Sequence, residues 1–486
     1  MRGKVFLILA VFVFLSVLFL SPPAQAAGQA EEGAKKVAEV MEYLVSHHLS
    51  RPEADVLTES AIEGMIAALN DPYTEYLSPE ELSFFVNSLE GEFSGIGIEL
   101  EAALPGRSCP VVTRVLPGSP AAATGLRVGD EIVSVDGEKT AGRPLSEVVQ
   151  KIRGPEGSLV RLTVRREGKG EFDLEVKRAQ IAGPTCEWEI ADDNTGYIHI
   201  QSFGTRTAGE FRSALDAMLK AGIKGLVLDL RNDPGGYLQA AVDIAGNFLP
   251  PGTTVVTAID RDGEREEMRT PPDAAGRRLP LAVLVNQYTA SAAEVLAGAL
   301  GDYKAATLVG TRTFGKGVVQ AVVPLSSGGA LKMTVARFLT PRGFSLEKKG
   351  LLPQRIVSLP ELQPVIARQL IKSGKTDRIV FCLDGSGAWV NEEKVSISFT
   401  PFPSGEKIYL PLRFTLEALG YEVEWREETG QITLKDGEKE VLLSAKDFVT
   451  AKDGTAYISG DFLNAAHCKV FQEGNNIVVR RLFPEK

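Results

Sequence analysis

The sequence predicts a multidomain α+β protein. A length of 486 residues is enough for two to four domains at about 150 residues each. Three stretches carry different patterns: residues 91–178 are short β-branched runs between glycines and prolines, residues 179–360 alternate strands with helices, and residues 376–486 contain a repeat. Hydrophobic residues make up 44% of the chain and charged residues 24%, which is ordinary for globular protein. Each stretch can therefore bury a core.

The chain begins with the pattern of a secretory signal. A basic start precedes residues 5–20, which are almost wholly apolar, and the small-residue pattern AQA follows at 24–26. This order of features predicts a signal peptide over residues 1–26 and a secreted or extracytoplasmic protein. The apolar run is somewhat short for a membrane span, but an uncleaved signal would anchor the chain in the membrane through residues 5–20.

The overall charge limits the class of binding partner, and the number of cysteines limits the disulfides that the chain can form. The formal net charge is −10, and loss of the signal would leave 51 basic residues against 63 acidic ones. This balance argues against nucleic acid as a partner, because nucleic acid requires a basic face. Four cysteines in a secreted chain of this length are no disulfide framework. Cys382 and Cys468 share the C-terminal segment, where they either pair or remain buried thiols.

Residues 31–90 are predicted to form an N-terminal helical segment. A helix over 59–69 should stop at the Asn-Asp-Pro sequence of residues 70–72. A second helix should start at Ser78 as N-cap, with Pro79 in the first helical position.

Residues 91–178 are rich in strands and glycines. SGIGIEL, followed by GLRVGDEIVSVDG, resembles a PDZ domain. Glycines in the first motif let backbone amides turn towards a carboxylate, and the strand after them has an open edge to which an extended peptide can add. The candidate peptide-binding residues are Gly95, Ile96, Gly97 and Ile98. The alternative is a scaffold that binds nothing, because a fold does not imply a function.

Residues 179–360 should form a layered α/β core. KGLVLDL and LAVLV are apolar throughout, as buried parallel strands are. Helices are expected between such strands, and strand–helix repetition produces a layered α/β architecture. The expected strands are 196–200, 224–230, 281–285 and 307–309, and the expected helices are 208–221 and 292–300.

Residues 376–486 form a separate module with an internal repeat. Tyr409 and Tyr457 occupy equivalent positions 48 residues apart, and strand–helix–strand–strand is predicted twice. This unit resembles the copper amine oxidase N-terminal-like module of bacterial surface proteins, and the resemblance suggests the cell wall as a partner. No histidine or cysteine cluster has metal-ligand spacing, so we expect no metal.

Ser291 is the candidate nucleophile. The buried strand 281–285 is followed by a tight turn and by a helix that begins near Ala292. A serine at such a strand-to-helix elbow exposes its hydroxyl beside the amides of a helix start. The alternative is that Ser291 merely caps the helix, which serine does well.

Lys316 is the candidate general base, because none of the four histidines lies where a triad would need it. The sequence GTRTFGKG begins like a phosphate-binding loop. Gly317 stands where that loop needs Ser or Thr, and a strand follows instead of a helix. Burial lowers the pKa of a lysine and so makes it a base. The alternative is a surface lysine on a glycine turn.

Gln320 and three backbone amides complete the candidate site. The Gln320 side-chain oxygen can orient the lysine amine, although four residues span about 13 Å in an extended strand. The backbone must therefore curl, which the glycines beside Lys316 allow. Amide donors for an oxyanion are expected from Gly235 or Gly236 in DLRNDPGGY and from Ala292.

The order of PDZ-like segment, DLRNDPGG, TASAAE and TFGKGVVQ resembles the C-terminal processing peptidases, or tail-specific proteases, over residues 31–360. The resemblance implies a crotonase-like α/β core and a Ser-Lys mechanism without metal or cofactor. It makes Ser291 the nucleophile, Lys316 the base and Gln320 the orienting residue. Ala293 departs from the family, which usually has serine there, and we expect altered hydrogen bonding at the helix start rather than lost activity.

The predicted function is a serine endopeptidase to which the PDZ domain presents the C-termini of substrate proteins. The rival from another class is a non-catalytic cell-envelope adaptor, with a PDZ domain and a wall-binding tail. A Ser-Lys esterase is a second rival. A homo-oligomer is compatible with the sequence.

Overall fold

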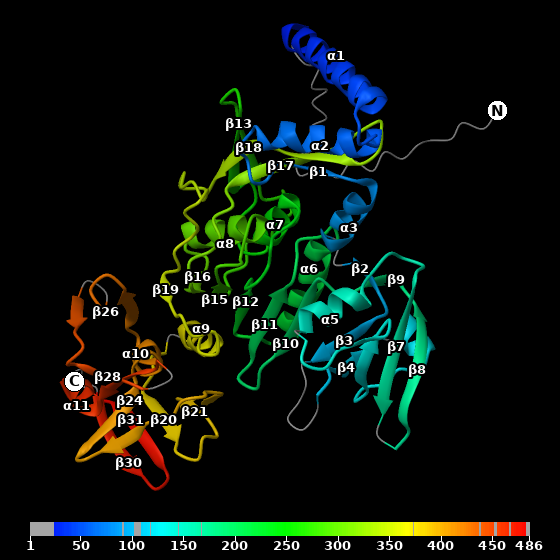
Figure 1. The fold of residues 1–486 in the computed structure, drawn as a ribbon. Helices are drawn as coiled ribbons and strands as arrows, with labels where there is room; N and C mark the ends of the chain where they lie inside the picture. Colours follow the sequence, from blue (N-terminus) through cyan, green and yellow to red (C-terminus); the bar gives the residue numbers. More distant parts are fainter. Residues whose placement is uncertain are drawn as a thin grey trace. The chain divides into compact units, whose positions relative to one another are not determined.

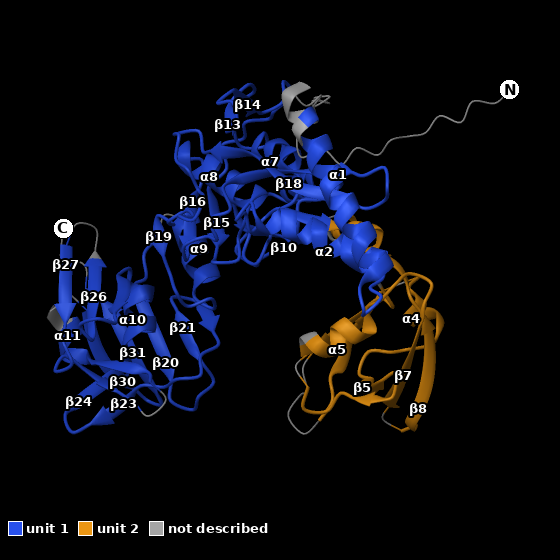
Figure 2. Ribbon diagram, turned by 45° about the horizontal axis from the view of Figure 1, so that its top comes forward, with its two compact units in different colours: residues 1–76, 186–486 blue, residues 77–185 orange. Residues whose placement is uncertain are grey.

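The computed structural model describes residues 24–486 apart from 90–91, 102–107, 117, 144, 167, 373, 437–438, 452–453, 466–467 and 483–486 (Figure 1). The chain forms two compact units: residues up to Tyr76 together with Cys186–Lys486, and Leu77–Thr185 (Figure 2). The apolar run of the predicted signal lies outside the described residues. Among the helices that are described, none has a stretch long and apolar enough to cross a membrane.

The N-terminal segment contains two long helices, α1 (Ala24–His47) and α2 (Ala54–Ala67). The second helix begins five residues before the predicted one, and the chain turns at Asn70, whose φ is 51°. The short strand β1 (Glu75–Leu77) then pairs with a strand of the core. The predicted segment 31–90 is thus shared between the two units.

The core of the first unit is a six-stranded sheet (Figure 1). Its order is β10 (Cys186–Ile190), β11 (Thr195–Ile200), β12 (Gly225–Asp229), β15 (Leu281–Val285), β16 (Thr307–Gly310) and β19 (Arg355–Ile356). All neighbours after β10 run parallel. Strands β12 and β15 are buried at every position, as their apolar sequences predict for parallel strands covered on both faces. The helices are α6 (Thr207–Lys220), α7 (Leu238–Ala245), α8 (Ala292–Asp302) and α9 (Gln363–Ile371).

A second sheet of the core carries the lysine-containing segment. Its order is β1, β18 (Ala330–Leu339), β13 (Thr254–Asp260) and β14 (Arg265–Arg269), and β17 (Val318–Pro324) also pairs with β18. The ladder between β17 and β18 shifts register between Val319 and Gln320. Such a bulge bends the strand and re-aims its side chains.

The second unit is a small antiparallel β domain. Its main sheet has the order β3 (Ile98–Glu101), β4 (Val111–Val115), β5 (Glu131–Val135), β7 (Leu159–Arg166) and β8 (Gly170–Lys177), and β6 (Glu138–Lys139) pairs with β5. Strands β2 (Glu92–Gly95) and β9 (Ala179–Ala182) form a separate pair. The helices are α3 (Pro79–Leu89), α4 (Pro120–Ala123) and α5 (Leu145–Ile152). As predicted, Ser78 caps α3, because its hydroxyl accepts from the Glu81 N–H at 3.2 Å.

The C-terminal module belongs to the first unit and repeats one motif. The motif runs β24 (Lys407–Pro411), α10 (Leu412–Leu419), β25 (Glu422–Arg426), β26 (Gln431–Asp436), and again β29 (Ala456–Ser459), α11 (Gly460–Ala465), β30 (Cys468–Glu473), β31 (Asn476–Arg481). The other strands are β20 (Arg378–Cys382), β21 (Ala388–Val390), β22 (Glu393–Val395), β23 (Phe402–Ser404), β27 (Lys439–Leu443) and β28 (Phe448–Thr450). Cys382 and Cys468 do not form a disulfide. These architectures confirm the predicted multidomain α+β fold.

Candidate functional site

Ser291 lies at the elbow between β15 and α8. Its φ of 54° and ψ of −119° are unusual for a residue other than glycine. Such strain persists only where neighbours hold it, and it is frequent at active sites. The Ser291 N–H donates to the Glu294 side chain at 3.1 Å, and the N–H of Ala290 donates to the Asp233 carbonyl at 3.0 Å. The serine is therefore fixed on both sides in a turn that the local sequence alone would not favour.

Glu294 joins the serine turn to the lysine loop. Its side chain is fully buried. Oε2 accepts from the N–H groups of Ser291 and Lys316, at 3.1 and 2.9 Å, so those two nitrogens lie within 6.0 Å of each other. Oε1 accepts from the Gly315 N–H at 2.8 Å and from the Thr313 hydroxyl at 2.5 Å. Burial raises the pKa of the Glu294 carboxyl, and these hydrogen bonds oppose the rise.

Sequence reasoning missed the role of Glu294, although a signal was present. The glutamate stands three residues after Ser291, in the position where an acidic side chain reaches back to the amide that precedes a helix. The pattern alone predicts only a helix cap. The second half of its role, holding the Lys316 loop, depends on a contact 22 residues away.

Lys316 is partly buried and hydrogen-bonded. Its amine donates to the Gln320 side-chain oxygen at 2.6 Å. The Nζ atom also lies 5.4 Å from the centre of the Tyr73 ring. Burial lowers the pKa of Lys316, and the positive charge of Lys332 lowers it further. The carboxylates of Glu75, Glu347 and Asp71 oppose this shift, and the net result is a pKa below the ordinary value for lysine.

Gln320 meets Lys316 because the backbone between them is not a regular strand. Gly315 has a φ of +89°, and the register shift of β17 falls immediately before Gln320. Together these features bring side chains four residues apart into contact. The Gln320 amide nitrogen donates to the Tyr73 carbonyl, so its oxygen must face the lysine.

Tyr73 is a second residue that sequence reasoning missed. It belongs to the DPYTEY segment, which a tight turn shapes: the Asp71 carboxylate accepts from the Tyr73 N–H at 3.0 Å and from the Thr74 hydroxyl at 2.6 Å. Tyr73 is 247 residues from Gln320 in the chain. No local pattern connects the two, because only the pairing of β1 with β18 brings this segment to the core.

The glycine turn after β12 lies against the serine. A Cβ on Gly235 would be 2.8 Å from both the Ser291 Cβ and the Ala292 nitrogen. The Gly235 N–H already donates to the Asp233 carboxyl at 2.8 Å, so it is not available as an oxyanion donor. Gly236 and Ala292 form no hydrogen bond through their N–H groups with any described residue. Of the three predicted donors, these two are therefore the ones that remain open.

Asp233 supports this turn from the interior. It is fully buried, and burial raises the pKa of its carboxyl well above the usual range. Its Oδ2 atom has no partner among the described residues. The hydrogen bond from the Gly235 N–H opposes this rise in pKa.

The predicted peptide-binding residues lie where β2 ends and β3 begins, within the second unit. Ile96 is 1% exposed, and its carbonyl accepts from the Ala121 N–H at 2.9 Å. Gly97 has a φ of +81°, and a Cβ there would lie 2.3 Å from the Ser119 Cβ. Strand β3, which begins at Ile98, is an edge strand of its sheet. An edge strand is the element to which an extended peptide can add.

No group of three or more His, Cys, Asp or Glu side chains in the described part of the chain is arranged to hold a metal ion. The Glu294 carboxylate joins the backbone of the Ser291 turn to that of the Lys316 loop, and the Lys316 amine in turn contacts the Gln320 amide.

Four family models match the chain. Peptidase family S41 matches residues 194–357, a PDZ domain matches 111–166, and the N-terminal domain of the activating protease CtpB matches 20–81. The copper amine oxidase N-terminal domain matches 389–461. These matches favour an enzyme over the non-catalytic adaptor.

Individual relatives agree with the family models. A probable CtpA-like serine protease of Staphylococcus epidermidis is 35% identical over 74% of this chain and 72% of its own length. The carboxy-terminal processing protease CtpA of Bacillus subtilis is 35% identical over 76% of this chain and 80% of its own. A solved photosystem II D1 C-terminal processing protease has 32% identity, a TM-score of 0.43, and coverage of 68% of this chain and 90% of that one. By its sequence relatives, the chain belongs to peptidase family S41, as a serine peptidase of the C-terminal processing type.

Proposed function

We propose that the chain is an endopeptidase in which Ser291 is the nucleophile and Lys316 is the general base, oriented by Gln320. The observation that carries the proposal is the 2.6 Å hydrogen bond from the Lys316 amine to a glutamine whose own orientation is set by the Tyr73 carbonyl. A neutral amine that donates one proton to Gln320 keeps its lone pair free for a hydroxyl.

The reaction proceeds in two halves. The Ser291 oxygen attacks the scissile carbonyl carbon while its proton passes to the Lys316 amine. The N–H groups of Gly236 and Ala292 donate hydrogen bonds to the resulting oxyanion. Collapse of the intermediate breaks the C–N bond, and the Lys316 ammonium gives its proton to the leaving amine. Water, activated by the neutral Lys316, then hydrolyses the ester and frees Ser291.

The second unit supplies the substrate in this proposal. An unstructured C-terminus adds to the edge of β3, and its carboxylate is held by amides of the Gly95–Ile98 turn. The signal pattern of residues 1–26 supports secretion, so the substrates are extracytoplasmic proteins. N-terminal sequencing of the mature protein tests this localisation. A new terminus at residue 27 supports secretion, and an intact Met1 on membrane-bound protein supports the anchored form. An intact Met1 on protein in the cytoplasmic fraction opposes both.

The test of the catalytic assignment uses a reporter protein with a nonpolar C-terminal tail. Loss of a catalytic group of this kind lowers kcat by at least about a hundredfold, so we expect this for both Ser291→Ala and Lys316→Ala. Tail removal at the wild-type rate by either variant would refute the dyad. A small ester turned over faster than any peptide would instead support an esterase. A tail-binding control, with the reporter and Ser291→Ala, separates lost chemistry from lost capture.

A further inference from the structure

The outer face of one sheet in the C-terminal module carries basic and aromatic side chains in neighbouring rows. This sheet has the strand order β22-β21-β20-β31-β30. Its inner face is closed by side chains without exposed surface: Ile379, Phe381, Val390 and Val479. Because side chains alternate between the two faces of a strand, the residues between these lie on the opposite, outer face.

Three cations form a row across the outer face. Arg378 on β20 lies directly opposite Arg480 on β31, and Arg480 lies directly opposite Lys469 on β30. Like charges directly opposite each other destabilise a sheet. Arg378 forms an ion pair with Glu473 at 2.9 Å, whereas no described residue forms an ion pair with Arg480 or Lys469. The mutual repulsion of the three cations therefore destabilises the sheet. Among the described residues, an ion pair offsets this repulsion only at Arg378.

On the same outer face, the next row of paired residues includes two aromatic side chains. Trp389 on β21 lies opposite Val380 on β20, and Phe471 on β30 lies opposite Val478 on β31. Val380 and Val478 are themselves directly opposite each other. Trp389 is 39% exposed although it lies on a sheet, and the exposed Lys394 stands opposite it on β22. Two aromatic rings, each with a cation beside it, therefore flank the middle of the sheet.

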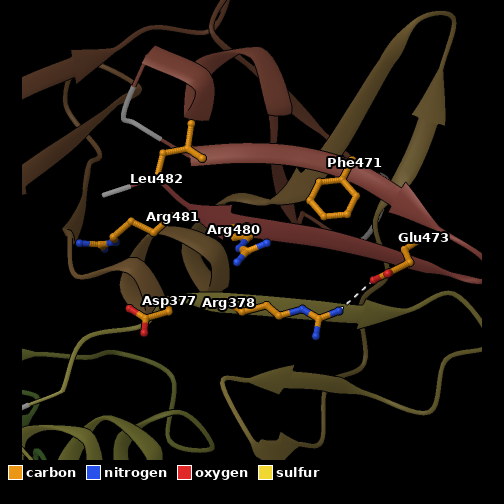
Figure 3. A pocket seen from close by; sticks show the side chains of 7 residues that line it. All are labelled: Asp377, Arg378, Phe471, Glu473, Arg480, Arg481 and Leu482. Atoms are coloured by element: carbon orange, nitrogen blue, oxygen red, sulfur yellow. Dashed lines mark hydrogen bonds and ion pairs between the residues drawn. The ribbon is translucent and has the colours of Figure 1, made fainter. Parts of the chain in front are cut away.

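An open pocket of about 670 Å³ lies at the basic end of this face (Figure 3). A volume of this size falls within the range of small-molecule sites, about 300–1,000 Å³. Figure 3 shows Arg378 and Glu473 joined by their ion pair, with Arg480 and Phe471 on the neighbouring strands. The residues that line the pocket include Asp377, Arg378, Phe471, Glu473, Arg480 and Arg481.

The basic face does not follow from the composition of the module. Residues 376–486 carry 18 acidic and 13 basic side chains. A net negative module would be repelled by a polyanion unless its cations were gathered on one surface. Gathering three of them in one row, against the cost of their mutual repulsion, indicates a negatively charged ligand.

We propose that this face binds an acidic polysaccharide. Its carboxylates engage Arg480, Lys469 and Arg378, because a guanidinium matches a carboxylate with two parallel hydrogen bonds. Its sugar rings lie on Trp389 and Phe471, because the negative face of an aromatic ring attracts the polarised C–H groups of a sugar. A lipid surface fits less well, since it requires an apolar face that inserts among the headgroups. Here the two apolar residues between the rings offer little surface, because Val380 is half-buried and Val478 is only 1% exposed.

The probe for this proposal is polygalacturonate, a chain of carboxylated sugars, with the full-length protein. We expect saturable binding that weakens with added salt, because exposed charges are screened. The double variant Lys469→Gln and Arg480→Gln should bind at least about tenfold more weakly, as expected for the loss of one or more charged hydrogen bonds. The matched control is Lys439→Gln with Lys446→Gln, which changes the net charge equally on exposed side chains of the same module. It should lose less than about twofold, since screened surface charges contribute little.

Further measurements separate binding of an acidic polysaccharide from binding of a membrane or an acidic protein. Fully methyl-esterified polygalacturonate keeps the sugar backbone without the charge and should bind at least about tenfold more weakly. Trp389→Ala should weaken binding without any change of charge. Unchanged peptidase activity and an unchanged thermal unfolding profile in every variant show that both the core and the C-terminal module are folded. Equal losses in the basic-face and control variants would overturn the proposal. So would tighter binding to phosphatidylglycerol vesicles or to polyglutamate, which would assign the face to a membrane or to an acidic protein.

Discussion

Replacing Glu294 by glutamine tests whether one buried carboxylate holds both halves of the site. The carboxylate accepts four hydrogen bonds, two from the lysine loop backbone, one from the serine turn and one from Thr313. Glutamine has nearly the same shape but only one acceptor oxygen. If its NH₂ faces the Ser291 and Lys316 amides, both lose their partner. If it faces the other way, the Gly315 amide loses its partner and the Thr313 hydroxyl must reorient.

The expected magnitude follows from these counts. An unsatisfied buried donor costs about 1–3 kcal/mol, so one or two of them lower the stability of the core by roughly 1–6 kcal/mol. At about 2–4 °C per kcal/mol for a domain of this size, the melting temperature should fall by at least about 2 °C. Misplacement of a catalytic group by about 1 Å costs about a hundredfold in rate. We therefore expect kcat to fall by that order while KM changes little.

The assay is tail removal from a reporter, followed in parallel with thermal unfolding. Glu264→Gln is the matched control, because Glu264 is an exposed glutamate of the same unit. Measurements at a temperature where both variants are folded separate positioning from unfolding. A Glu294→Gln enzyme with kcat within twofold of wild type and an unchanged melting temperature would refute the reasoning.

Three further predictions concern the lysine and the glycine turn. The rate of tail removal should rise with pH through the lowered pKa of Lys316, because only the neutral amine is a base. Lys332→Gln removes a positive charge that lowers this pKa, so the rising part of the pH–rate profile should move to higher pH. If the pH–rate profile of Lys332→Gln rises at the same pH as that of the wild type, the charge of Lys332 does not lower the pKa of Lys316. Gln320→Glu puts a carboxylate beside the Lys316 amine, which should raise the pKa of that amine. A pKa higher by about one would reduce the rate at neutral pH about tenfold. Recovery of the rate at higher pH distinguishes this effect from a structural loss. Gly235→Ala should lower kcat by at least about a hundredfold, because its Cβ would lie 2.7 Å from the Ala290 carbonyl oxygen. Gly252 also has a positive φ, +70°, but a Cβ there would meet no atom within 4 Å, so Gly252→Ala should retain activity.

Much of the protein could be read from local patterns. The strand Leu281–Val285 has the predicted bounds, and α8 begins at the predicted Ala292. The repeat of the C-terminal module appears as two copies of one strand–helix–strand–strand motif. These features depend on the order of apolar, polar and glycine residues within short windows, which is information that the sequence carries directly.

Local sequence patterns indicated only some residues of the candidate site. Ser291, Lys316 and Gln320 stand in short motifs whose residue types already indicate their chemistry. The prediction that Gly235 donates to an oxyanion did not allow for Asp233, two residues away, which occupies that N–H group.

By itself the sequence determined the order of the modules, the elbow at Ser291 and the lysine that serves it in the proposed mechanism. Only the tertiary structure decided that Tyr73 sets the orientation of Gln320, that Glu294 holds two loops, and that Arg378, Arg480 and Lys469 share one row. The physical reason is that strand register and the direction of a side chain are properties of paired segments. Residues far apart in the chain acquire a common neighbour only when those segments pack, and no window of sequence contains both partners.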